Sequence, residues 1–194
     1  TQGINALEKM AALVLALGGY KRQLRRQTFR APNGEMLRPT INIGGVFSAG
    51  EGGKVNTVPA AASFTIDRRV LPNENVRTAE RELTAFLKKA ARQIPQCRIT
   101  VNKISDNFSC YRPPSHPLFT ALQASVTRIR RRPTNFVVST GFNDMHFFAQ
   151  VKKIPTVGYG PGGIDYHGVD ERARVKDLVD SAKIYADLLT TFQG

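Results

Sequence analysis

The stretch PAAASFTIDRRVL, residues 59–71, alternates apolar and polar side chains over most of its length. A period of two is typical of a strand with one buried face, so the sequence predicts a strand here. Just upstream, TINIGGVF (residues 40–47) is rich in β-branched side chains and is followed by Gly50, Gly52 and Gly53. We interpret the two segments as a hairpin whose strands are joined by a glycine-rich turn.

Apolar residues recur at helical spacing on both sides of this hairpin. One helix is expected over Ile4–Leu17, stopped by the Gly18-Gly19 pair, and another over Asn75–Ile94, closed by Pro95. Residues 97–104 alternate again and predict a third strand. The order helix, strand, strand, helix, strand predicts an α+β, ferredoxin-like two-layer sandwich that lacks its first strand, with both helices on one face of an antiparallel sheet.

The second half of the chain has a different pattern, and YRPPS (residues 111–115) is typical of a linker. We therefore place one domain over 1–112 and another over 113–194. Further helices are expected over 117–131, 144–151 and 175–192, and short buried strands over 136–139 and 156–159. This alternation predicts a partial α/β unit with a right-handed βαβ crossover, which is too small to cover both faces of a parallel sheet by itself.

Composition narrows the class of protein. The chain has 194 residues of which 41% are hydrophobic, enough to bury a core of ordinary size. There is no run of eighteen apolar residues and no signal-peptide pattern, so we expect no membrane partner. Two cysteines without a C-x-x-C pair favour a reducing, cytoplasmic setting.

The formal net charge of +13 raises the question of nucleic acid. Basic residues gather near two expected helix ends, where the helix dipole already favours positive charge: Lys21, Arg22, Arg25, Arg26 and Arg30, then Arg128, Arg130, Arg131 and Arg132. The strand shaped most like an RNA-binding platform offers one aromatic, Phe64. We expect no specific nucleic acid. A ferredoxin-like RNA-binding or dimerisation module is the alternative, and RNA binding would show a steep salt dependence.

Three blocks of sequence resemble the M20 family of zinc metallopeptidases and deacylases, which includes acetylornithine deacetylases, succinyl-diaminopimelate desuccinylases and carboxypeptidases. They are NTVP (56–59) with DRR (67–69), then STGFNDMHFF (139–148), and then GYGPGGIDYHGVDER (158–172) with VKDL (175–178) and AKIYA (182–186). The opening GINA (3–6) is similar to the start of the family's lid domain. The resemblance thus covers the whole chain and implies a lid followed by the C-terminal part of a catalytic domain.

That resemblance implies an activity and a ligand set. The parent enzyme would cleave the amide bond of N-acyl amino acids or small peptides with two zinc ions, cobalt being an alternative metal, and would dimerise through the lid. His167 takes the place of a zinc ligand. Asn56 and Arg69 take the places of residues that bind the substrate's carboxylate or acyl oxygens across a dimer interface, and Gly141 takes the place of a backbone N–H donor to the substrate.

The chemistry of these residues agrees with the implied roles. Arginine offers a two-pronged fork to carboxylate, asparagine an amide donor to an oxyanion, and glycine allows close approach of its backbone. Each also fits a structural role: a turn residue for Asn56, an exposed strand charge for Arg69, a tight turn for Gly141 and a surface position for His167.

The family's other metal ligands and its general-base glutamate have no counterpart in this sequence. We therefore assign no catalytic residue here and expect the chain alone to be inactive and to bind zinc weakly or not at all. His116 and His146 match nothing in the family pattern. Asp144 and Glu171 are interpreted as structural, one as a helix cap and one as an ion-pair partner near the metal loop.

Overall fold

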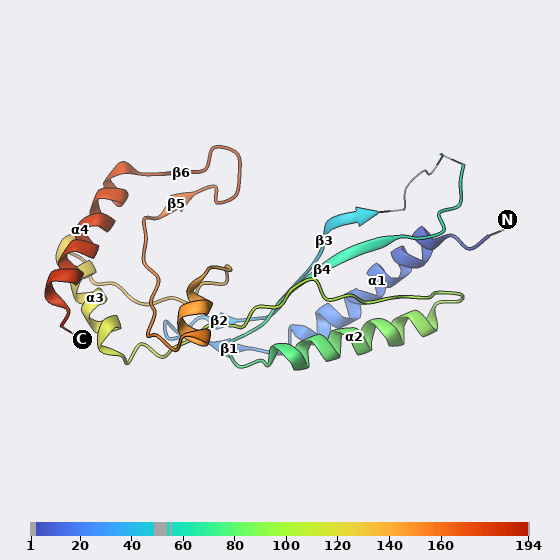
Figure 1. Cartoon of the computed structure of the whole chain (residues 1–194), viewed down its shortest axis with the longest axis horizontal. Coiled ribbons are helices and arrows are strands. Elements are labelled where there is room, and N and C mark those ends of the chain that lie inside the picture. The colour runs from blue at the N-terminus through green and yellow to red at the C-terminus, as the bar shows by residue number, and fades with distance from the viewer. Residues whose placement is uncertain (1–2, 49–53, 55, 194) are drawn as a thin grey trace. The chain divides into compact units, whose positions relative to one another are not determined.

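A computed structural model describes residues 3–48, 54 and 56–193. The chain folds as two compact units, Thr1–Arg30 with Met36–Ser109, and Ala31–Glu35 with Cys110–Gly194 (Figure 1). The strands in the described part of the chain all pair antiparallel, which confirms the α+β architecture expected for the first half.

The predicted hairpin is formed by β3 (Thr40–Ser48) and β4 (Ser63–Arg69). Their register joins Thr40 to Arg69 at one end and Ser48 to Ser63 at the other. A bulge interrupts it at Gly44, whose φ of 136° suits a residue without a side chain. The Thr65 hydroxyl donates to the Gly44 carbonyl and accepts from Val46 N–H at 3.2 Å. The glycine-rich turn predicted at residues 50–53 lies outside the described residues.

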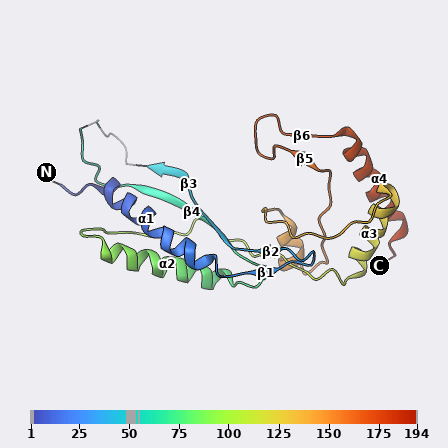
Figure 2. The ribbon, with the colours of Figure 1, turned by 180° about the vertical axis from the view of Figure 1, so that it is seen from behind.

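Two helices pack on one face of this hairpin, α1 (Ala6–Leu24) and α2 (Val76–Gln93) (Figures 1 and 2). Asparagine caps both: the Asn5 side chain accepts from Leu7 N–H at 3.0 Å, and the Asn75 side chain accepts from Thr78 N–H at 3.1 Å. The predicted end of the first helix at Gly18-Gly19 is wrong, because the helix runs on to Leu24. Burial of the last turns against the sheet outweighs the weak helix propensity of two glycines.

The core of the first unit lies between the helices and the inner face of the hairpin. Its centre is the fully buried Leu17, packed among Tyr20, Leu24 and Leu87. The residues that pack around these are Ile41, Ile43, Phe64, Ile66, Leu83, Phe86 and Ile99. Phe64 and Ile66 are two apart on β4, so the sequence alternation correctly predicted which face is buried.

The strand predicted over 97–104 is absent, since these described residues have no regular secondary structure. Cys97 and Ile99 nevertheless pack against the core, while Ile104 is 82% exposed. The alternation therefore predicted the burial of Cys97 and Ile99 correctly, but not the exposure of Ile104 or the lack of a strand. A strand requires ladder hydrogen bonds to a neighbour, and among the described residues this segment is paired with no strand. The unit's other strands are the short pair β1 (Phe29–Arg30) and β2 (Met36–Leu37).

The second unit is built on two helices, α3 (Pro117–Arg130) and α4 (Val175–Thr191), both as predicted. Leu122 and Val126 of α3 and the fully buried Ile184 of α4 form its core. Between the helices lie η1 (Phe147–Val151), a π-helical turn within the helix predicted over 144–151, and a short antiparallel hairpin, β5 (Gly163–Ile164) with β6 (Arg172–Ala173).

The parallel βαβ crossover predicted for this unit does not form among its described residues. Residues 136–139 and 156–159 are not strands, although Val157 and Tyr159 pack against the α3–α4 core and Phe136 lies 5.3 Å from Phe119 between ring centroids. These segments lack strand structure for the same reason as residues 97–104. Parallel strands form in a sheet whose two faces are both covered, and each strand needs a neighbour in that sheet.

No helix in the described ranges is both long and apolar enough to cross a membrane.

Candidate substrate-binding and metal-binding residues

Arg69 is the last residue of β4 and points to the face of the hairpin opposite the core. Its side chain is 48% exposed and pairs with Asp67, with Arg69 Nε 3.0 Å and a terminal nitrogen 2.9 Å from one carboxylate oxygen. An exposed pair of this kind contributes little free energy, so a substrate carboxylate could replace Asp67 at small cost. The neighbouring Arg68 faces inward and is buried.

Asn56 lies in an exposed turn of the connection between β3 and β4, where Thr57 N–H donates to the Lys54 carbonyl at 2.9 Å. The connection is tied to the start of α1, because Ala6 N–H donates to the Pro59 carbonyl at 3.0 Å. Arg69 lies at the other end of β4. At strand rise the length of β4 separates Ser63 from Arg69 by roughly 20 Å, and Asn56 precedes Ser63 in the connection at that end. Asn56 and Arg69 of one chain therefore do not converge on an amino-acid-sized ligand.

His167 lies in the loop that joins β5 to β6 and is exposed. The loop is tightly built: Asp165, His167 and Asp170 all have left-handed backbone angles, with φ between 59° and 63°. His167 N–H donates to the Glu171 carboxylate at 3.2 Å, so Glu171 holds the histidine's backbone and is not an ion-pair partner in this loop. An Arg172–Asp165 ion pair of 2.9 Å closes the loop's base. These contacts fix the backbone and leave the imidazole accessible.

A metal site needs three or four converging ligands. No group of three or more histidine, cysteine, aspartate or glutamate side chains in the described part of the chain is arranged to hold an ion. His167 could supply one ligand, and the described residues do not fit a complete zinc site around it.

Gly141 lies in an exposed bend between residues 136–139 and η1. Its N–H, the group that the resemblance assigns to substrate, donates to the Ser139 hydroxyl at 3.2 Å. An added Cβ would lie 3.5 Å from that hydroxyl, an ordinary contact. The space around Gly141 within this chain would therefore also accept a residue with a Cβ.

The remaining histidines have structural surroundings. His116 caps α3, its Nδ1 accepting from Leu118 N–H at 3.2 Å. His146 is buried between Phe142 and Phe147, with ring centroids 5.1 and 4.1 Å away. The helical turn at 145 is capped by Asn143, whose side chain accepts from Met145 N–H at 3.0 Å, and not by Asp144 as expected.

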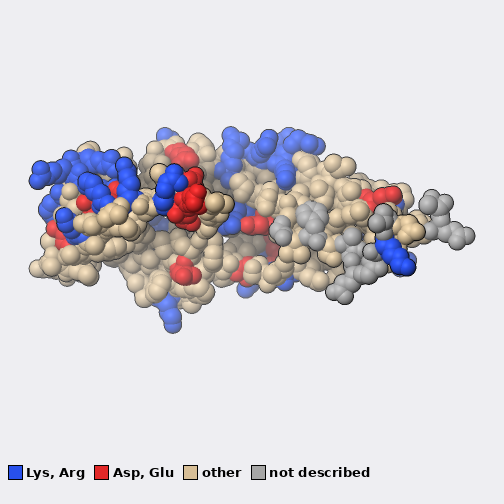
Figure 3. All heavy atoms as spheres, turned by 90° about the horizontal axis from the view of Figure 1, so that it is seen from above, with Lys and Arg blue, Asp and Glu red and all other residues tan. Residues whose placement is uncertain are grey.

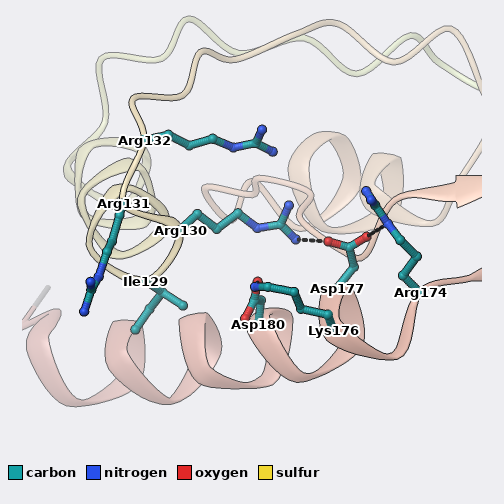
Figure 4. Close-up of a pocket in the computed structure, with 8 residues that line it drawn as sticks. All are labelled: Ile129, Arg130, Arg131, Arg132, Arg174, Lys176, Asp177 and Asp180. Atoms are coloured by element: carbon teal, nitrogen blue, oxygen red, sulfur yellow. Dashed lines mark hydrogen bonds and ion pairs between the residues drawn. The ribbon is translucent and has the colours of Figure 1, made fainter.

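Sequence reasoning missed a cleft of about 450 Å³ between the end of α3 and the start of α4 (Figure 4). It is lined by Ile129, Arg130, Arg131, Arg132, Arg174, Lys176, Asp177 and Asp180. The sequence pattern favours a solvated helix end for the arginines of α3. The basic residues at the start of α4 are the signal in the sequence that could have indicated this cleft. Positive charge at a helix N-terminus opposes the helix dipole, so it is unusual there without a further role.

Ion pairs order the floor of this cleft. Asp177 lies 2.9 Å from Arg174 and 3.4 Å from Arg130, and Asp180 lies 2.6 Å from Lys176. The hydrogen bond from Lys176 holds the pKa of Asp180 below its ordinary value, so this carboxylate is ionised at neutral pH.

The first unit thus belongs to the class of two-layer α+β domains in which two helices cover one face of an antiparallel hairpin. Residues 1–95 match the family model described as the peptidase dimerisation domain of the M20 type, and this part of the chain belongs to that family. Among solved structures, the chain is similar to an M20 family metallo-carboxypeptidase from Sulfolobus solfataricus, with a TM-score of 0.61 and 20% sequence identity. The similarity covers 78% of this chain and 35% of that one, and it shows a shared fold. No curated protein matched the chain.

Proposed function

We propose that the chain is the lid, with part of the catalytic domain, of a zinc-dependent M20 amidohydrolase that acts in the cytoplasm on N-acyl amino acids or small peptides. The observation that carries this proposal is the match of residues 1–95 to the M20 peptidase dimerisation domain. Both cysteines, Cys97 and Cys110, are free, in keeping with a reducing compartment.

The second unit supports the proposal through its surface. Many of its large apolar side chains are exposed, including Val137 at 70%, Val169 at 89%, Val175 at 75% and Leu189 at 81%. Apolar surface of this extent is typical of a unit that packs against further polypeptide. In the proposed parent, that polypeptide supplies the general base and the ligands that would join His167.

The residues of this chain would bind and orient the substrate. Arg69 would exchange its exposed contact with Asp67 for the substrate's carboxylate, and Asn56 would donate its amide N–H to an acyl oxygen. Because the two lie at opposite ends of the hairpin, we assign them to different sites of a dimer, with Asn56 of one protomer meeting Arg69 of the other. β3 and β4 form a sheet of two strands, and the edge of such a sheet is a surface through which two lids could associate.

The experiment is to measure the mass of the full chain in solution by light scattering and to assay it against N-acetyl amino acids with added zinc. We expect the mass of a dimer and no hydrolysis above buffer. Hydrolysis at a rate comparable with a complete enzyme would overturn the assignment of the general base to other polypeptide. A monomer at all concentrations tested would overturn the dimerisation role. An Arg69→Ala variant should dimerise as the unaltered chain does, because Arg69 is assigned to the substrate and not to assembly.

A further inference from the structure

The cleft between α3 and α4 carries a positive charge that its own acids do not balance. Four arginines and one lysine line it against two aspartates. Asp177 and Asp180 are already shared among Arg130, Arg174 and Lys176. Arg131 and Arg132 have no acidic partner within the described ranges. In Figure 3, lysine and arginine side chains gather over the unit that carries these helices.

The directions of the arginines differ in a way that defines a site. Figure 4 shows Arg130 and Arg132 running the same way, toward the start of α4, while Arg131 runs elsewhere. One terminal nitrogen of Arg130 lies 3.4 Å from Asp177, and its Nε is buried without a hydrogen-bond partner. A buried guanidinium with unused donors is costly unless a ligand satisfies it.

The N-terminus of α4 also favours an anion in this cleft. Arg174 precedes the helix without a side-chain cap. Asp177 N–H donates to the Arg174 carbonyl at 2.9 Å, which leaves the N–H groups of Val175 and Lys176 for another acceptor. Arg174, Lys176 and Asp177 all line the cleft, which places this first turn at its wall. Helix N-termini bind anions, and guanidinium groups bind phosphate oxygens in pairs.

We propose that this cleft binds the diphosphate group of a small molecule, with Arg132 as its main ligand and Arg130 and the first turn of α4 as supports. A diphosphate suits the site better than a single carboxylate for two reasons. Five basic groups against two acids leave three positive charges to be balanced, and a cleft of about 450 Å³ exceeds the needs of one small oxyanion.

The test is calorimetric titration of the full chain with inorganic pyrophosphate, and separately with adenosine diphosphate, at low and at physiological salt. We expect saturable binding that weakens with salt, and an affinity for R132A lower by about tenfold. R131A should lose clearly less, because that side chain points away, and R92A in the last turn of α2 should bind as the unaltered protein does. Far-UV circular dichroism checks that each variant is folded.

Equal affinity for the two ligands locates recognition in the diphosphate, and tighter binding of the nucleotide adds a contact to its base or sugar; both outcomes support the proposal. Equal losses in R131A and R132A would overturn it, since they would show attraction by net charge alone. A single-stranded RNA that binds more tightly than either ligand would also overturn it in favour of nucleic acid. Absence of any saturable binding of either ligand would likewise overturn the proposal.

Discussion

Arg68 and Arg69 are adjacent on β4, yet the strand turns them to opposite faces of the hairpin. The Arg68 side chain is 7% exposed and forms an ion pair with Glu74, itself 13% exposed, whose other oxygen accepts from Leu71 N–H at 2.6 Å. The Arg69 side chain is 48% exposed and pairs with an equally open Asp67. Two adjacent arginines thus form ion pairs with carboxylates that contribute differently to the free energy of unfolding, because one pair is buried and the other is exposed.

We expect Arg68→Ala to lower the free energy of unfolding by roughly 3 kcal/mol, because it leaves the Glu74 carboxylate buried without its cation. Arg69→Ala removes the same charge from an exposed site and should cost less than about 1 kcal/mol. Urea denaturation of both variants, followed by circular dichroism, makes the comparison. Equal losses would show that the buried pair is not formed in solution.

The candidate site residues could be chosen from the sequence one at a time, but their arrangement could not. Motif spacing selects Asn56 and Arg69, and the chemistry of amide and guanidinium predicts what each can bind. Whether they meet depends on hairpin register and on the length of β4, which places them at opposite ends. The same limit explains the missed cleft, since Arg132 and Arg174 are brought together only by the packing of α3 against α4.

At the level of elements, helices were predicted well and isolated strands poorly. A helix satisfies its backbone hydrogen bonds within one segment, so local periodicity is enough to find α2, α3 and α4. The hairpin was also found, because its two strands are close in sequence. Residues 97–104, 136–139 and 156–159 show the alternation or apolar character of strands, and some of their apolar side chains pack against a core, yet these described residues form no ladder.

The extension of α1 through Gly18-Gly19 leads to a prediction about helix stability. Glycine in a helix interior costs roughly 1 kcal/mol relative to alanine, chiefly through backbone entropy. A Cβ on Gly18 would meet only the Arg22 guanidinium at 3.7 Å, an ordinary contact with a flexible side chain. Gly18→Ala should therefore stabilise the protein by roughly 0.5–1 kcal/mol.

A shift of the urea midpoint to higher concentration at unchanged slope would agree with a helix that continues past Gly18. If alanine lowers the midpoint, the glycine pair is needed as a break or for close contact, and the helix ends earlier. Gly34→Ala provides the contrasting control, because Gly34 has a φ of 87° and alanine there is strained, so this substitution should destabilise.

On the scale of the whole molecule, each unit has its own hydrophobic centre. Leu17 is fully buried among residues of α1, α2 and the β3–β4 hairpin, and Ile184 is fully buried among residues of α3, α4 and the segment around Val157. The cluster around Leu17 consists of first-unit side chains, and the cluster around Ile184 consists of second-unit side chains. Separate cores favour separate unfolding transitions, because cooperativity follows the extent of packed contacts.

We therefore expect two transitions in differential scanning calorimetry of the full chain. Leu17→Ala should lower one of them and Ile184→Ala the other, each by the several degrees that correspond to a loss of roughly 2–5 kcal/mol. Leu15→Ala and Leu189→Ala, at positions 80% and 81% exposed, serve as matched controls and should leave both transitions nearly unchanged. If either core substitution shifts a single common transition, the two units unfold as one cooperative body, and the M20-type lid would owe part of its stability to the segment that follows it.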